Sequence, residues 1–231
     1  MSCARVPPAW VEGLPGGMSH AWYRPMTIRA IMVDVDGVII VHPDARGWSA
    51  HLERDVGVPA SALQTRFFEP HWDDVIHGRA SLRERLAPVL NEISPHVTCD
   101  ALVDYWFGND AHMNHALLAE LASIRAAGTA VHLATVQDHE RAHYLWHDLD
   151  LRSRFDGLHY AAELGCAKPA PGFFRSIEAR TGFRPQDLFL IDDSIANVEG
   201  ATACGWAAAL WTGTETVRSL VHNRLRHDGT E

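Results

Sequence analysis

Short apolar runs that end at polar residues recur along the chain, and they predict the strands of a buried sheet. The first run spans residues 28–33, is broken only by Arg29, and is followed directly by Asp34. Its short length and its β-branched residues favour a strand over a helix. Runs of the same kind predict further strands at 129–134, 155–160, 188–191 and 206–211.

Helical periodicity fills the intervals between these runs. Residues 115–127 carry apolar side chains on one stripe, and Gly128 marks the end of that helix. Helices are also expected at 138–149, at 171–182 with Pro171 at the start, at about 195–204, and after residue 211. Alternating strands and helices predict an α/β fold with a doubly wound, Rossmann-like parallel sheet covered by helices on both faces.

Between the first and second predicted strands the pattern changes to short amphipathic helices. They are expected at 48–56, at 60–68 ending before Pro70, from the capping-box residue Ser81 onward, and at 98–107. We therefore predict a core domain formed by residues 27–42 and 113–231, with an inserted α-helical cap subdomain at 43–112. The Pro- and Gly-rich residues 1–26 are expected to be an N-terminal extension.

Composition limits the classes of binding partner and the cellular compartment that we expect for this protein. The 231 residues are enough for one core with an insertion. A net charge of -9 disfavours a nucleic-acid interface, and no apolar run is long enough to cross a bilayer. Four scattered cysteines without metal-like spacing suggest reduced thiols in a cytoplasmic protein. We expect a monomer or homodimer with a small-molecule substrate and neither nucleic acid nor membrane as partner.

The polar residues at the predicted strand ends are the candidates for chemistry. Asp34 and Asp36 follow the first strand, and an apolar run at 38–41 predicts a hairpin or flap over them. Parallel strands present their carboxyl ends at one edge of the sheet, where ligands bind. Two acids at such a place need a compensating charge, and a divalent cation is the simplest one.

Three further groups belong to the same edge. They are Thr135 at the second strand end, Asp192 with Asp193 at the fourth, and Lys168 in the loop before Pro171. Each has a plainer explanation: Thr135 as a helix cap, Lys168 as a solvated loop residue, and one of the two acids as a cap. Their joint occurrence in this order is more specific than any one of them.

This set resembles the haloacid dehalogenase-like superfamily over residues 28 to about 212, and the insertion resembles its helical class 1 cap. Within the superfamily the chain is most similar to sugar-phosphate phosphatases of the glucose-1-phosphate phosphatase type. The matching positions are Asp34-Val35-Asp36-Gly37-Val38, Thr135, Lys168-Pro169 and Asp192-Asp193-Ser194, continued by Asn197, Gly200 and Gly205.

The resemblance implies a mechanism. Asp34 would attack phosphorus to form an aspartyl-phosphate, and Asp36 would serve as acid and then as base. Asp34, the backbone carbonyl of Asp36, and Asp193 would bind Mg²⁺, with Asp192 reaching it directly or through water. Thr135, the N–H of Val136, and Lys168 would hold the phosphoryl group, and Asn197 would lie behind the metal ligands.

The sequence also departs from the family pattern. Thr135 is followed by Val136 and Gln137, where Asn or Gly usually follows directly. This change bears on recognition of the leaving group and so on the sugar-phosphate assignment. A second change, Val33 in place of a frequent Phe, is one of packing. Six residues are candidates for selecting the substrate, although each is also explained as structural or solvated: His42, Arg66, His71, Trp72, Arg79 and Trp106.

The predicted function is a magnesium-dependent phosphatase acting on a small phosphorylated metabolite, with sugar phosphates among the candidates. One alternative is a 2-haloacid dehalogenase, in which Asp34 attacks carbon and neither Asp36 nor a metal-binding acid pair is needed. A phosphomutase shares the two acids. A non-catalytic binding protein is a further alternative, against which the intact acids and Lys168 count.

Overall fold

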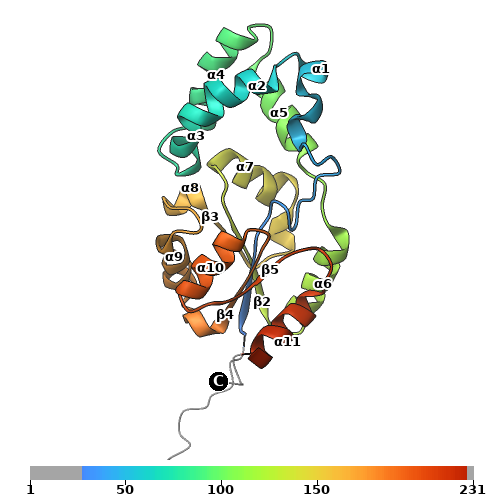
Figure 1. Ribbon diagram of the computed structural model, residues 1–231, viewed down its shortest axis with the longest axis vertical. Coiled ribbons are helices and arrows are strands. Elements are labelled where there is room, and N and C mark those ends of the chain that lie inside the picture. Colours follow the sequence, from blue (N-terminus) through green and yellow to red (C-terminus); the bar gives the residue numbers. More distant parts are fainter. Residues whose placement is uncertain (1–27, 228–231) are drawn as a thin grey trace, which may run out of the picture.

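The computed structural model describes residues 28–227, and its centre is one five-stranded parallel sheet (Figure 1). The strand order β3-β2-β1-β4-β5 is that of a doubly wound fold, which confirms the predicted fold class. The strands are β1 (Ala30–Val33), β2 (Ala130–Thr135), β3 (Gly157–Tyr160), β4 (Leu188–Asp192) and β5 (Ala207–Leu210).

The strand register brings the predicted acids to the same level of the sheet. Val33 of β1 is paired with Leu133 of β2 on one side and with Ile191 of β4 on the other. The next residue, Asp34, donates its N–H to the Ile191 carbonyl at 2.9 Å. Asp34 therefore lies beside Asp192, at the carboxyl edge of the two central strands.

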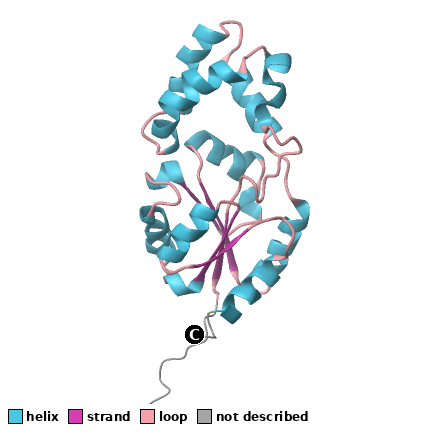
Figure 2. Cartoon of the chain, viewed as in Figure 1, coloured by secondary structure: helices cyan, strands magenta, loops and turns pink. Residues whose placement is uncertain are grey.

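Helices cover both faces of the sheet (Figure 2). Alternate side chains of β1 point to opposite layers, since Ile31 belongs to one buried cluster and Met32 to another. On the Ile31 side lie α6 (His115–Ala126) and α11 (Val217–His227). On the Met32 side lie α9 (Pro171–Thr181) and α10 (Ile195–Ala203).

The predicted helix at 138–149 is present but irregular. It starts as α7 (His139–His143), capped by Asp138, and continues as the π-helical η3 (Tyr144–Asp148). Three short elements escaped the sequence pattern because each is only one turn long. These are η4 (Leu151–Ser153), α8 (Ala161–Leu164) and η5 (Pro185–Asp187).

Between β1 and α6 the chain forms helices that pack around a hydrophobic core of their own, which includes Leu52, Phe67 and Leu102. They lie beyond α7 from the sheet (Figure 1). The elements are η1 (Trp48–His51), α1 (Leu52–Val56), α2 (Ala60–Leu63), η2 (Gln64–Phe68), α3 (Glu69–Ile76), α4 (Leu82–Ile93) and α5 (Cys99–Asn109). We refer to residues 48–109 as the inserted helices.

The expected helix end before Pro70 is wrong, because α2, η2 and α3 run on continuously. The π-helical turn η2 shifts the hydrogen bonding by one residue, so that the Glu69 N–H donates to the Gln64 carbonyl. Pro70 then follows the π-helical turn directly, as the second residue of α3. The capping box is present, with Ser81 accepting the Glu84 N–H.

The two connections to the inserted helices run side by side directly after the acidic loop. Val41 donates its N–H to the His112 carbonyl at 2.9 Å, and Ile40 forms a bridge with Met113. Among the described residues, the hairpin or flap expected at 38–41 is represented only by this antiparallel bridge, and its position over the acids stays a prediction. Residues 38–40 are buried in the core, whereas Val41 is exposed.

The remaining expectations from the sequence concern membrane-spanning helices, the cysteines and the domain boundaries. Within residues 28–227, no helix combines the length and apolar character that a membrane crossing needs. Cys99, Cys166 and Cys204 are free thiols. The expected extension at 1–26 lies outside the described residues, and the domain boundaries stay predictions.

Candidate active site

Three carboxylates meet at the carboxyl edge of the central strands. Asp34 follows β1, Asp192 ends β4 and Asp193 comes next, and one oxygen from each lies within 4.8 Å of the others. Asp34 is 8% exposed and Asp192 is fully buried, whereas Asp193 is exposed. The edge thus carries three negative charges, two of them withdrawn from water.

Lys168 enters this group from the loop before α9. Its buried ammonium lies 2.9 Å from Asp34 Oδ1 and donates to Asp192 Oδ2 at 2.5 Å and to the Ala134 carbonyl at 2.8 Å. Burial alone would lower the pKa of Lys168, but the two carboxylates raise it above its usual value. Lys168 is therefore a fixed positive charge, which removes the alternative of a solvated loop lysine.

The remaining oxygens are unequally occupied. Asp192 Oδ1 accepts the Ser194 N–H and the Asn197 side-chain amide, both at 2.9 Å, so protein donors engage both of its oxygens. Asp34 Oδ1 accepts the Val35 N–H at 2.7 Å as well as Lys168. The contacts that described residues make with Asp34 thus leave Oδ2 for a substrate or a cation.

Asp193 lies against the acidic loop. Gly37 has φ +75°, and a Cβ there would lie 2.6 Å from Asp193 Cγ and overlap its Oδ2. Only glycine suits both the left-handed backbone and this close approach. The loop after β1 and the end of β4 are therefore fitted to each other at the site.

The donor set fits a hard divalent cation. Burial raises the pKa of Asp34 to about 7, and Asp192 adds to that effect. The pKa of Asp193 is raised by burial and by Asp192. Three acids against the one ammonium of Lys168 leave excess negative charge, and carboxylate oxygens are the ligands that Mg²⁺ prefers. Asp34 and Asp193 are the side chains best placed to hold it.

The carboxylate of Asp36 stands apart from this cluster. Its Oδ2 accepts a hydrogen bond from the Gln137 side-chain amide at 2.7 Å. Asp36 reaches solvent, yet protein atoms surround it on most sides. This desolvation raises its pKa, as does Asp110, while Arg141 and Gln137 act to lower it. The Asp36 carboxylate is therefore not one of the three that meet at the sheet edge.

Thr135 ends β2 and is almost fully buried. It does not cap the following helix, because the Asp138 side chain accepts the N–H groups of Glu140 and Arg141. Gln137 Nε2 lies 3.5 Å from the Thr135 hydroxyl. The Thr135 hydroxyl therefore lies beside the same amide that contacts Asp36.

Sequence reasoning missed the surroundings of Asp36. In the sequence Gln137 stands out only as a departure from the family pattern, and neither Asp110 nor Arg141 carries a signal of its own. The buried Arg141 donates to the Phe107 and Asp110 carbonyls and forms an ion pair with Asp110 at 3.5 Å. Because these contacts join α7 to the end of α5, only the folded chain reveals them.

Four of the six candidate substrate-selecting residues are engaged within the inserted helices. Arg66 forms an ion pair with Glu92 at 3.1 Å. Arg79 forms ion pairs with two acids of α3. Trp72 and Trp106 belong to an aromatic cluster, with ring centroids 5.7 Å apart.

The two candidate histidines also have local partners. The ring of His42 hydrogen-bonds the backbone of Asp44 and lies edge-on to His112. His71 lies 6.3 Å from the ring of Phe67. The contacts found for these six side chains thus lie within the inserted helices and their connection to the core. That these side chains select the substrate stays a prediction.

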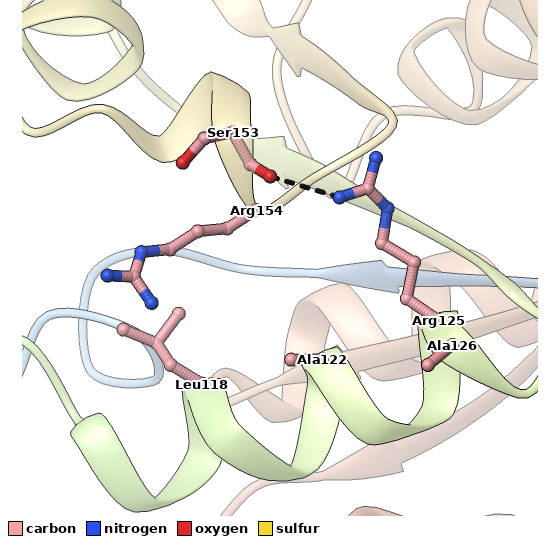
Figure 3. A pocket seen from close by; sticks show the side chains of 6 residues that line it. All are labelled: Leu118, Ala122, Arg125, Ala126, Ser153 and Arg154. Atoms are coloured by element: carbon pink, nitrogen blue, oxygen red, sulfur yellow. Dashed lines mark hydrogen bonds between the residues drawn. The ribbon is translucent and has the colours of Figure 1, made fainter.

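A separate hollow of about 400 Å³ lies between α6 and η4 (Figure 3). Residues of α6 line it on one side and residues at the end of η4 on the other: Leu118, Ala122, Arg125 and Ala126, and Ser153 and Arg154. Arg125 donates to the Ser153 carbonyl at 3.1 Å across it. It shares no residue with the acid cluster and lacks a carboxylate, so it does not compete as the reaction centre.

Comparison with known proteins agrees with this geometry. Residues 28–205 match the family model for haloacid dehalogenase-like hydrolases. A solved structure described as a predicted HAD-like family hydrolase from Porphyromonas gingivalis is similar with a TM-score of 0.69 at 22% identity, covering 87% of this chain and 98% of that one.

Two further structures show the range of the similarity. A HAD family enzyme from Bacteroides thetaiotaomicron, in complex with magnesium and inorganic phosphate, is similar with a TM-score of 0.70 at 18% identity over 84% of this chain and 98% of that one. The L-2-haloacid dehalogenase from Xanthobacter autotrophicus gives 0.55 at 18% identity over 85% and 82%. At these identities the likeness concerns the fold.

The family model spans most of the chain, and it includes the strands that carry Asp34, Thr135 and Asp192 together with the Lys168 loop. The protein belongs to the haloacid dehalogenase-like hydrolases.

Proposed function

We propose that this hydrolase is a magnesium-dependent phosphatase of a small phosphorylated metabolite and that it works through an aspartyl-phosphate. The observation that carries the proposal is the buried Asp34–Lys168 pair at 2.9 Å inside a group of three acids. A second acid, Asp36, lies two residues further on and is held separately. The Bacteroides relative bound to magnesium and inorganic phosphate supports the same chemistry.

In the proposed first step Asp34 Oδ2 attacks phosphorus and the bond to the ester oxygen breaks. Asp36 gives its proton to that oxygen. Lys168 neutralises Asp34 and the phosphoryl group, while the Thr135 hydroxyl and the Val136 N–H hold phosphoryl oxygens. Mg²⁺, when bound by Asp34, Asp193 and the Asp36 carbonyl, supplies the charge that lets an anionic nucleophile approach an anionic ester.

In the second step Asp36, now a carboxylate, takes a proton from water. The water oxygen bonds to phosphorus, and the bond from phosphorus to Asp34 breaks. Inorganic phosphate leaves, and both acids return to their starting states. The two acids thus need different surroundings: Asp34 beside Lys168, and Asp36 beside an amide donor.

We further propose that residues 43–112 act as a cap that closes over the sheet edge and excludes water during transfer. The two connecting segments run side by side next to the acidic loop. Movement of the inserted helices would therefore shift this loop. For the substrate we propose a sugar phosphate, by similarity to the glucose-1-phosphate phosphatase type.

The decisive experiment is a phosphate-release screen over a metabolite panel with magnesium present. We expect turnover of at least one phosphate monoester, which EDTA abolishes. Asp34→Asn should be inactive, whereas Asp148→Asn, at an exposed acid away from the edge, should retain full activity. Activity that survives both EDTA and Asp34→Asn would refute the mechanism.

A 2-haloacid dehalogenase is the second candidate, because the Xanthobacter enzyme shares the fold. In that reaction Asp34 displaces halide from carbon, and no proton needs to reach the leaving group. Asp36 with its amide partner would then have no role. Halide release from chloroacetate without magnesium would favour this candidate, and isomerisation of a sugar phosphate would favour a phosphomutase. Absence of both magnesium binding and hydrolysis would favour a binding protein.

A further inference from the structure

We infer that Gln137 is a positioning residue that fixes which oxygen of Asp36 carries the transferable proton, and that it thereby equips the site for alkyl phosphates. This inference rests on the proposed function and deepens it. Its basis is the 2.7 Å hydrogen bond from Gln137 Nε2 to Asp36 Oδ2, between residues 101 positions apart in the chain.

The chemistry of the contact is directional. An amide nitrogen can only donate, so it favours a carboxyl oxygen that carries no proton. With Gln137 on Oδ2, the proton of a neutral Asp36 is confined to Oδ1. The same bond stops rotation of the carboxyl group. Oδ1 is therefore the oxygen presented to the leaving group, and afterwards the one that receives the proton of water.

Gln137 is itself held rigidly enough for this role. The residue is 5% exposed, and its carbonyl accepts the Ala162 N–H at 3.1 Å, which ties the segment to α8. Nε2 also lies 3.5 Å from the hydroxyl of Thr135, the proposed phosphoryl-binding residue. One amide group therefore contacts both Thr135 and Asp36. An Asn at this position would be one methylene too short to keep both contacts.

The consequence concerns the class of substrate. An alkyl ester leaves as a strongly basic alkoxide unless it is protonated, so it depends on the acid. A nitrophenyl ester leaves as a stable anion and needs no proton. Precise placement of the Asp36 proton therefore matters for alkyl phosphates, such as those of sugars or polyols, and hardly matters for activated aryl phosphates.

The test compares Gln137→Met with wild type on glycerol phosphate and on p-nitrophenyl phosphate, with magnesium. The value of kcat/KM reports the steps up to cleavage of the ester bond. We expect it to fall roughly 30-fold or more for glycerol phosphate, within the range of general acid catalysis, and to change less than about threefold for p-nitrophenyl phosphate. The kcat for p-nitrophenyl phosphate should fall, with a burst of nitrophenol, because water activation also uses Asp36.

The matched control is Asp138→Ala at the adjoining buried residue, which caps α7 and is not in hydrogen-bond contact with Asp36. We expect it to lower Tm and to reduce kcat/KM for both substrates by the same factor. Gln137→Asn is a second variant that keeps the amide but shortens its reach, and it should reproduce the selective loss. Inhibition by inorganic phosphate should be unchanged in Gln137→Met.

The inference is overturned if the Gln137 variants lose kcat/KM equally on both substrates or keep the wild-type kcat/KM on glycerol phosphate. In either case the phosphatase proposal stands. Failure of the wild-type protein to hydrolyse any phosphate monoester would instead refute the proposed function itself, before any variant is compared.

Discussion

At the scale of single residues, the site depends on how buried charges are compensated. Lys168 is the one cation in contact with Asp34 and Asp192 among the described residues. A buried ion pair adds little net stability, but removing one partner leaves the other charge stranded in a low-dielectric environment. We therefore expect the loss of Lys168 to reduce stability as well as to remove the positive charge beside the acids.

Replacing Lys168 by Met should lower the free energy of unfolding by about 3 kcal/mol in metal-free solution, as measured by urea denaturation. Activity with magnesium should fall roughly 100-fold or more, because one phosphoryl-stabilising charge is lost. Arg180→Met removes an exposed ion pair with Glu163 and should cost less than about 1 kcal/mol. Equal effects of the two changes would contradict the assigned role.

A second residue-scale prediction concerns a buried histidine away from the site. Burial lowers the pKa of His159 from 6.5 to about 4, and His132 and Arg180 act in the same direction. Between these values the unfolded chain binds a proton that the folded chain does not, so this histidine makes stability fall as the pH falls from 6.5 to 4.

His159→Phe removes this titration and keeps an aromatic ring. Relative to wild type, the variant should gain about 3 kcal/mol of stability between pH 7 and pH 4, since each pKa unit is worth about 1.4 kcal/mol. Urea denaturation across this pH range measures the difference. A constant difference between the two proteins would show that the folded state does not exclude the proton.

The residues at the site differ in how far sequence can predict them. Four site residues come at or just after the end of an apolar run: Asp34, Asp36, Thr135 and Asp192. That pattern was sufficient to predict that they lie at one edge of the sheet. The contact of Gln137 with Asp36 bridges 101 positions and has no local signature. Arg141 gave no signal either, because a buried arginine in a helix cannot be distinguished from a solvated one until its partners are known.

At the scale of elements, the strands and most helices follow from hydrophobic periodicity, whereas the π-helical turns do not. The sequence pattern placed a helix end before Pro70, but η2 reorganises the hydrogen bonds so that the helix continues. Such a turn depends on packing against neighbouring helices, which a single sequence does not reveal.

The contact between the loop after β1 and the end of β4 gives an element-scale prediction. Gly37→Ala places a methyl group on the Asp193 carboxylate, so Asp193 must move. We expect the magnesium concentration needed for half-maximal activity to rise at least about tenfold, as other disturbances of metal-site geometry do. Gly182→Ala has a similar φ of +72° and no atom within 4 Å, so it should cost stability only. A magnesium requirement unchanged by Gly37→Ala would contradict the assigned position of Asp193.

The contacts between α7 and the inserted helices give a second prediction at the scale of elements. Arg141→Met removes the buried contacts to the Phe107 and Asp110 carbonyls and should destabilise the protein by about 3 kcal/mol. Hydrogen exchange should accelerate first at residues 107–114. Arg83→Met cuts a partly exposed link between α4 and Glu140 and should have a much smaller effect. Uniform acceleration over the whole chain would argue against a local anchor.

At the scale of the whole molecule, the parallel sheet explains why residues far apart in sequence meet. The order β3-β2-β1-β4-β5 places the two acid-bearing strands in the centre, with β2 and its Thr135 alongside. The inserted helices leave and rejoin the core beside the same loop. The fold class and the edge were therefore predictable from sequence, whereas the path of the connections was not.

The most direct test of the account is to trap the covalent intermediate. Asp36→Asn with p-nitrophenyl phosphate and magnesium should still release nitrophenolate, which needs no proton, but should hydrolyse the phosphoenzyme slowly. After acid quenching, mass spectrometry should find one phosphoryl group on the peptide that contains Asp34. A phosphoryl group on another residue, or nitrophenol release with no modified peptide at all, would contradict the account.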